Sequence, residues 1–260
     1  KHTYNRQKFH RFSKSIELKL CNSQNFLPTL NCKGSEIIWL DYVDLKACRF
    51  NEFIQMLQKG EHGSIVKVTV RAQRDDNPHE FRDIGGSQLT EHLAVFRQKL
   101  EKEFYQVLPA TIEDSELIPG NFPTLVQRMF QIAAEKALPA INGTVFQPLH
   151  SAHYMDGTRM FSLVGIVYDR EEAGFINRKI GSWKFSNTRW QPPHHIDVPL
   201  LSAKERLHLE GLLPTTKNTG RALARALKYW IGDSEKDNLR RLQQYADFHK
   251  YYPFFGKVSV

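Results

Sequence analysis

Residues 36–70 constrain the fold more than any other part of the chain, because two strand-like runs enclose one helix-like run. The first run, residues 37–40, is apolar on both alternating faces, which is typical of a strand buried in a parallel sheet. Residues 50–57 carry apolar side chains at helical spacing, and two glycines then precede a β-branched run at residues 65–70. Strand, helix and strand over so short a stretch predict a βαβ unit.

Asp41 and Tyr42 follow the first of these strands directly. In open α/β sheets, ligands bind at the edge formed by the carboxyl ends of the parallel strands. The sequence therefore predicts that the functional site lies just after Asp41.

Periodicity predicts further elements on both sides of this unit. Residues 16–20 alternate apolar and charged side chains, as in a strand with one solvated face. Asp156-Gly157 lies between two strand-like runs, residues 144–154 and 159–168, and this dipeptide favours a hairpin. We also expect the aromatic segment 251–255 to pack on the core. Helices are predicted at residues 87–108, 123–138, 202–213, 219–231 and 234–250.

Charge and cysteine content narrow the class of protein. The chain has 36 Lys and Arg against 28 Asp and Glu, a net charge of +8, which suits an acidic partner such as nucleic acid or a phosphorylated molecule. The alternative is a basic surface that only aids solubility. No apolar run approaches the ~20 residues of a membrane helix and no secretory signal is present, so no membrane partner is expected. Three cysteines without metal-like spacing suit a reducing cytoplasm.

Five segments spread over residues 16–260 carry a family resemblance. They read IELKLCNSQNFLP, IIWLDYVDL, GSIVKVTV, MFSLVGIV and YADFHKYYPFFGKV. In this order they resemble the second half of the Rossmann-like sheet of class I S-adenosylmethionine-dependent methyltransferases, which ends in an antiparallel hairpin. More closely, the chain resembles a prokaryotic family of putative O-methyltransferases related to the three-Cys-motif partner proteins. The resemblance implies an α/β fold, a small-molecule cofactor, S-adenosylmethionine, and methyl transfer to an oxygen acceptor.

Two parts of the methyltransferase pattern are missing from the chain. No glycine-rich turn for the methionine part of the cofactor precedes Ile16, and no acidic residue for the ribose hydroxyls precedes Glu17. We therefore expect the amino-terminal cofactor-binding strands to lie upstream of Lys1. The expected organisation is a methyltransferase-like α/β core over residues 1–199 and a helical carboxy-terminal extension, residues 200–260, packed on it.

The resemblance also suggests roles for four residues. Asn22 and Ser23 take the position that contacts the adenine of the cofactor, although Asn22 could instead cap the following turn. Asp41 and Tyr42 take the position beside the transferred methyl group, where Asp41 could contact the cofactor and orient or deprotonate a hydroxyl. Tyr42 could stack on adenine or substrate, or serve packing alone. Asp44 is interpreted as a helix cap. The Asp/Asn-Pro-Pro-aromatic motif of amino-methylating enzymes is not found, which argues against base N-methylation.

A basic stripe forms a second candidate site. Arg221, Arg225 and Lys228 recur at positions i, i+4 and i+7 of a predicted helix and could contact phosphates or nucleic acid. The alternative is the solvated side of an amphipathic helix. Its apolar side is predicted to consist of Leu223, Ala226, Leu227 and Trp230.

Two other functions stay open beside methyl transfer. One is a catalytically inactive methyltransferase-like scaffold that holds nucleic acid or a protein partner, for example in a bacterial defence system. The other is a nuclease that binds a metal through Asp41 and Asp44, which lie too close in sequence to form such a site alone. His150 and His153 should point to opposite faces of a strand, so no metal site is predicted there.

Overall fold

The computed structural model divides the chain into two compact units, residues 1–194 and 195–260. Residues 252–255 of the predicted aromatic segment lie outside the part of the chain that is described. That part comprises residues 2–11, 13–73, 87–139, 143–197, 199–213 and 219–251.

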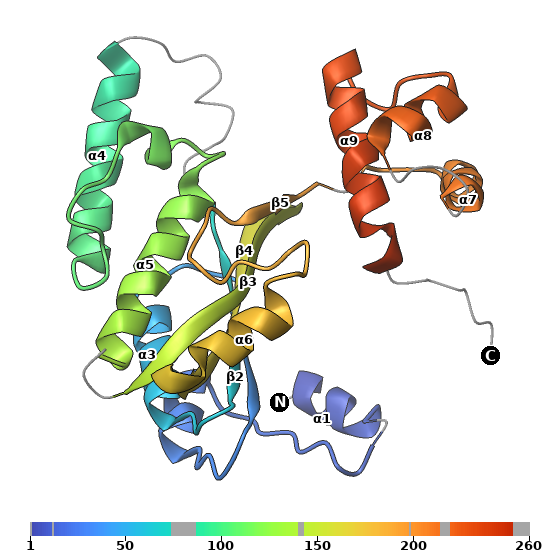
Figure 1. The fold of residues 1–260 in the computed structure, drawn as a ribbon. Helices are drawn as coiled ribbons and strands as arrows, with labels where there is room; N and C mark the ends of the chain where they lie inside the picture. Colours follow the sequence, from blue (N-terminus) through green and yellow to red (C-terminus); the bar gives the residue numbers. More distant parts are fainter. Residues whose placement is uncertain are drawn as a thin grey trace. The chain divides into compact units, whose positions relative to one another are not determined.

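The first unit combines helices with most of a five-stranded sheet (Figure 1). Its helices are α1 (His2–Phe9), α2 (Ser23–Phe26), α3 (Ala47–Lys59), α4 (Ser87–Phe104), α5 (Phe122–Ala137) and α6 (Ala173–Ile180). The strands are β1 (Ile37–Asp41), β2 (Ile65–Arg71), β3 (Thr144–Asp156), β4 (Thr158–Asp169) and the short β5 (His194–Ile196) at the unit boundary. Helix α6 lies in a stretch where no regular element is predicted from the sequence.

The sheet is mixed, with the strand order β1-β2-β4-β3-β5. Strands β1 and β2 are parallel, in a register that runs from Ile37 opposite Ile65 to Asp41 opposite Thr69. The predicted βαβ unit is therefore confirmed. Strand β4 pairs antiparallel with both β2 and β3, and Gly157, with a φ of 65°, makes the turn between β3 and β4. A positive φ is favourable for glycine, as the Asp-Gly dipeptide predicted.

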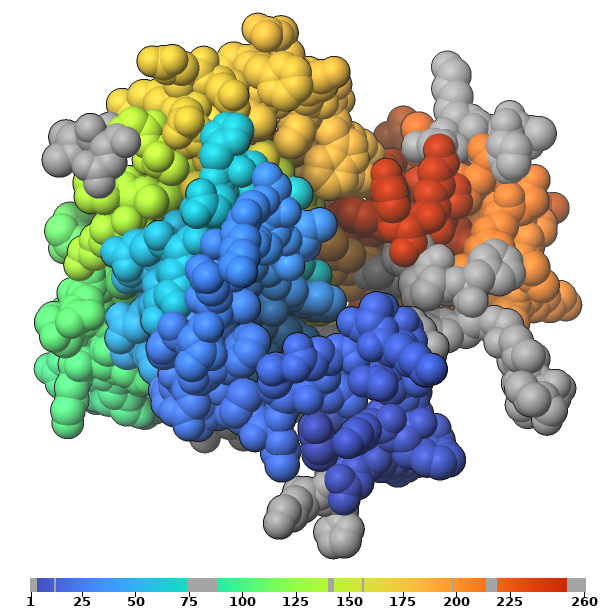
Figure 2. Space-filling view, turned by 90° about the horizontal axis from the view of Figure 1, so that it is seen from below, coloured from blue at the N-terminus to red at the C-terminus, as the bar shows by residue number. Residues whose placement is uncertain are grey.

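The prediction that the first strand is buried on both faces is wrong. Ile38 and Leu40 are buried, but the side chain of Ile37 is 80% exposed and that of Trp39 is 58% exposed. Burial alternates along β1, so the face with Ile38 and Leu40 is covered and the face with Ile37 and Trp39 is open. Figure 2 shows the blue surface of the segment that contains β1 next to the cyan surface of β2. Trp39 is held there by its indole N–H, which donates to Thr69 Oγ1 at 3.2 Å.

Helices α3 and α5 pack on the covered face through an aromatic core. Phe50 and Phe130 have ring centroids 4.5 Å apart, and Phe53 meets Phe146 of β3 at 5.5 Å. The ring of Phe146 lies over Gly165 of β4, where a Cβ atom would come within 2.1 Å of it. Glycine is thus required at this crossing of ring and backbone. On the opposite face, Gln147 of β3 accepts from Tyr168 and donates to Asn177 of α6, so α6 covers that side.

The strand predicted at residues 16–20 is not formed. The segment has no regular secondary structure and makes no ladder with the described strands. Its carbonyl groups accept from side chains instead: Arg11 donates to the Ile16 oxygen and Tyr4 to the Leu18 oxygen. Alternation of side chains fits a strand, but pairing needs a neighbour with free backbone groups.

The described part of the second unit is built on the helices α7 (Ala203–Leu212), α8 (Gly220–Leu227) and α9 (Glu235–Phe248) (Figure 1). The predicted capping box is present: Ser202 Oγ accepts from the Glu205 N–H, and Glu205 accepts from the Ser202 N–H at 2.7 Å. A core separate from that of the first unit joins the helices. It includes Leu209, Leu223, Leu227, Leu242 and Tyr245.

Helix α8 ends earlier than predicted. Lys228 adopts a left-handed conformation, with a φ of 61°, and closes the helix by donating its N–H to the Ala224 oxygen at 3.3 Å. The assignment of Trp230 to the apolar side of this helix is therefore wrong. Trp230 lies in the loop after the helix, and its side chain is 60% exposed.

Candidate active site

The carboxyl end of β1 borders a hollow of about 540 Å³. Ser23 of α2, Asp41 of β1 and Tyr42 all line it, so the structure brings together three of the four residues predicted near a cofactor. The walls are otherwise mostly apolar and include Leu30, Trp39 and Val43.

Asp41 presents an exposed carboxylate to this hollow. Among the described residues its side chain has no hydrogen-bond or ion-pair partner, while the neighbouring Tyr42 N–H donates to the Thr69 oxygen at 2.9 Å. The backbone ladder therefore fixes where Asp41 sits, and its oxygens stay available to a ligand. A hollow next to Asp41 was expected and is present. The role of Asp41 in binding or catalysis stays a prediction.

Tyr42, in contrast, is buried, and its hydroxyl donates to Glu52 Oε2 of α3. Burial raises the pKa of the phenol far above its usual value, and the bond to Glu52 raises it further. The Arg49 guanidinium lies 4.4 Å from the centroid of the Tyr42 ring. One face and the polar end of Tyr42 are thus occupied within the protein, which favours the packing alternative over stacking on a ligand.

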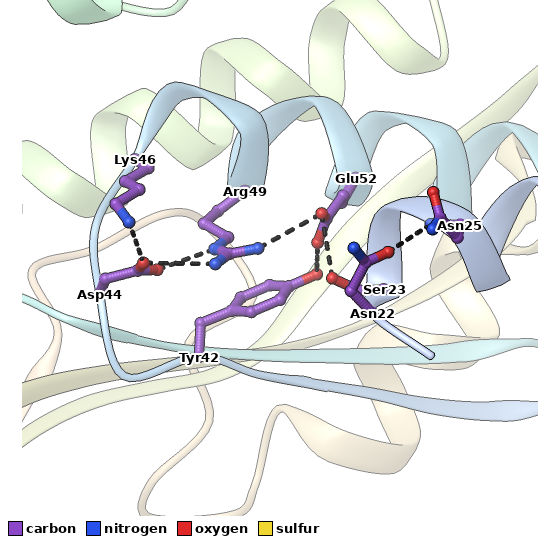
Figure 3. A network of polar contacts seen from close by, with 8 residues as sticks. All are labelled: Asn22, Ser23, Asn25, Tyr42, Asp44, Lys46, Arg49 and Glu52. Carbon is purple, nitrogen blue, oxygen red and sulfur yellow. Dashed lines mark hydrogen bonds and ion pairs between the residues drawn. The ribbon is translucent and has the colours of Figure 1, made fainter. Parts of the chain in front are cut away.

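Glu52 is the centre of this network, which Figure 3 shows from close by. Its Oε1 accepts from Ser23 Oγ at 3.1 Å and from the Arg49 guanidinium at 3.3 Å, and only 5% of the residue is exposed. A carboxylate with three donors around it satisfies the rule that buried charges are paired. Glu52 thereby links α2, the end of β1 and α3.

The sequence reasoning missed Glu52, although a signal was present. Glu52 lies beside Phe53 and one turn before Met56, both fully buried residues of α3. A charged residue on the buried side of an amphipathic helix, three residues after an arginine, predicts a buried ion pair.

Asp44 joins the network through its ion pair with Arg49. It accepts from Arg49 at 2.8 and 3.2 Å and from Lys46 at 2.9 Å, and Lys46 rather than Asp44 is the residue before helix α3. The Arg49 hydrogen bonds hold the pKa of Asp44 at about 2, below its ordinary value, despite partial burial. Asp44 thus stiffens the loop through its side-chain pairs, and the interpretation as a helix cap is wrong.

Asp41 and Asp44 face different hollows. Asp44 lines a second hollow of about 350 Å³ with Lys46, Arg71 and Lys99, whereas Asp41 lines the first. Across the described ranges, no group of three or more His, Cys, Asp and Glu is arranged to hold a metal ion. The geometry gives no support to a nuclease site built on these two carboxylates.

Asn22 caps helix α2, as the alternative interpretation anticipated. Its Oδ1 accepts from the Asn25 N–H at 2.9 Å, and Asn22 does not line the hollow. Its amide N–H groups are not used in this cap. Contact of Asn22 with an adenine stays a prediction.

The described residues form a mixed α/β fold that is consistent with a methyltransferase-like protein, and a hollow borders the end of β1. Residues 1–260 match the model of a family described as "Putative O-methyltransferase", and the chain belongs to that family. A search of curated proteins found no match. In the described part of the chain, none of the helices combines the length and apolarity needed to cross a bilayer.

Proposed function

We propose that this protein transfers a methyl group from S-adenosylmethionine to an oxygen acceptor at the hollow beside Asp41. The proposal is supported by the family match along the whole chain and by one observation: an exposed carboxylate, fixed by a strand end, borders a hollow of about 540 Å³. Small-molecule sites fall in the range of roughly 300 to 1,000 Å³ and join apolar walls to a few polar groups. In this proposal, residues 1–199 form a Rossmann-like catalytic core and residues 200–260 a helical extension.

The residues around the hollow fit the parts of this cofactor. The apolar surfaces of Leu30 and Trp39 suit an adenine ring, and the Asp41 carboxylate suits ribose hydroxyls or an ammonium group. Ser23 Oγ donates to Glu52 and keeps lone pairs to accept from a ligand. When bound, the cofactor supplies an electrophilic methyl group on a sulfonium.

The protein's own part in such a reaction is positioning. An in-line displacement gains most of its acceleration from holding nucleophile and methyl carbon in register. Asp41 accepts a hydrogen bond from the acceptor hydroxyl or from the cofactor and thereby orients it. The network of Asp44, Arg49 and Glu52 keeps the segment after β1 fixed, so that Asp41 keeps its place.

Calorimetry with S-adenosylmethionine tests this proposal. We expect binding to the unmodified chain and a loss of roughly tenfold to a hundredfold in affinity for Asp41→Asn, because hydrogen bonds to a charged group contribute about 1.5–3 kcal/mol. The matched control is Asp169→Asn, which changes another exposed aspartate at the end of a strand and should leave binding unchanged.

Absence of binding to the unmodified chain would overturn the proposal and favour the inactive scaffold. One observation favours the inactive scaffold: the Tyr42 hydroxyl donates its hydrogen bond to Glu52 and is not free for catalysis. Equal loss of affinity in both aspartate variants would remove Asp41 from the site.

A further inference from the structure

Helix α8 of the second unit presents a cationic face to solvent. Arg221, Arg225 and Lys228 are exposed, whereas Leu223 and Leu227 on the other side are buried. Gly220 brings the helix into backbone contact with α9, since a Cβ there would lie 2.5 Å from the Leu239 oxygen and from the Gln243 nitrogen (Figure 1). This close approach fixes which side of α8 points outward.

These three cations differ from the other arginines of the unit in having no carboxylate partner within the described ranges. Arg206 pairs with Glu210, and Arg240 and Arg241 both pair with Asp237. The two arginines of α9 are therefore neutralised by carboxylates of the same unit. What sets Arg221, Arg225 and Lys228 apart is that these cations, without an ion-pair partner in the described part of the chain, lie together along one helix.

A hollow of about 490 Å³ lies against this face. Arg221, Arg225 and Lys228 line it together with Tyr229 and Trp230. The side chain of Trp230 is 60% exposed and that of Tyr229 is 48% exposed, with the Tyr229 hydroxyl donating to Glu205 at 2.8 Å. One carboxylate, Glu235, also lines the hollow, so positive charge prevails there.

We propose that this hollow binds single-stranded nucleic acid. Arg221 and Lys228 are seven residues apart, or about 10 Å along a helix at 1.5 Å per residue, so the cations span more than one phosphate. An exposed indole beside them offers a face on which a base stacks. An amphipathic membrane helix would need free apolar side chains, but the leucines of α8 are used in the core of the unit. The inference does not depend on methyl transfer.

Fluorescence anisotropy with labelled single-stranded RNA and DNA of mixed sequence, over a series of salt concentrations, tests this inference. Three phosphate contacts should give a slope of log K against log salt of about −2, at ~0.7 per phosphate. The triple variant R221Q/R225Q/K228Q should bring the slope close to zero. Trp230→Ala should weaken binding about tenfold at an unchanged slope, because stacking is not ionic.

The matched control is the triple variant K204Q/K236Q/K250Q, which removes the same charge from exposed positions that do not line the hollow. It should retain most of the affinity. Circular dichroism of each variant checks folding. The inference would be overturned if binding did not depend on salt, or if both triple variants weakened it equally. It would also be overturned if Trp230→Ala had no effect, or if the protein preferred anionic lipid vesicles over oligonucleotides. Preference for RNA or for DNA would identify the nucleic acid.

Discussion

The two units of this protein use charged side chains in opposite ways. Around the end of β1, Arg49 forms ion pairs with both Asp44 and Glu52, and these pairs hold the segment in place. On α8, Arg221 and Arg225 have no such partner among the residues that the structure describes, and they point to solvent beside a hollow. Paired charge that is buried fixes geometry, whereas exposed charge without a partner is free to meet a ligand. Variants of the first kind should therefore alter folding, and those of the second kind should alter binding.

Glu52→Ala should have the largest effect on stability. It leaves the Tyr42 hydroxyl, Ser23 Oγ and part of the Arg49 guanidinium without their acceptor, and removal of one partner of a buried ion pair costs about 3 kcal/mol. Urea unfolding should show this loss. Glu135→Ala, at an exposed position of helix α5, is the control and should change stability by less than about 0.5 kcal/mol. Similar losses in both would mean that Glu52 is not the centre of the network.

Asp44→Asn should reveal a pH-dependent loss. Because the pKa of Asp44 is lowered to about 2 in the folded state, its stabilisation is fully present above its ordinary pKa and disappears as the pH falls from about 4 to about 2. The free energy of unfolding should be at most about 2 kcal/mol lower for the variant near neutral pH. The two proteins should converge below pH 4. A difference that stays constant across that range would exclude the pairs with Arg49 and Lys46 as its source.

Tyr42→Phe should cost less, about 1 kcal/mol in urea unfolding, because the ring remains and Glu52 keeps two other donors. Tyr105→Phe, which removes a hydroxyl from an exposed ring, is the control and should be neutral. If Tyr42→Phe were also neutral, the hydroxyl would not contribute to the network, and the phenol would again be a candidate for a role at the hollow.

Arg225→Gln should have the smallest effect, within about 0.5 kcal/mol of the unmodified chain. Leu223→Ala, on the buried side of the same helix, should instead cost about 3 kcal/mol. Urea unfolding of these two variants compares how much each face of α8 contributes to stability. A marked loss for Arg225→Gln would show that the cationic face supports the fold, and the contrast between the units would fail.

Local patterns were sufficient to predict several elements. The parallel strands around α3, the turn at Gly157 and the cap at Ser202 each follow from residues close in sequence. The hollow beside Asp41 was also foreseen, because strand ends in α/β sheets share an edge.

The predictions that failed concern features that depend on residues distant in sequence. The alternation at residues 16–20 could not reveal that no strand lies beside it to pair with. The exposure of Trp39 depends on which elements cover each face of β1, and the sequence of one strand cannot encode that. The partners of Glu52 come from α2, from the residue after β1 and from α3, and only the folded chain brings them together.

Lys228 links the shape of α8 to the charge it carries. A left-handed backbone costs a lysine roughly 1 kcal/mol that a glycine would not lose. Glycine is also the usual residue where a helix ends in this way. The strained backbone therefore falls on the residue whose ammonium group lines the hollow beside α8, so the end of the helix and the cationic face depend on the same position.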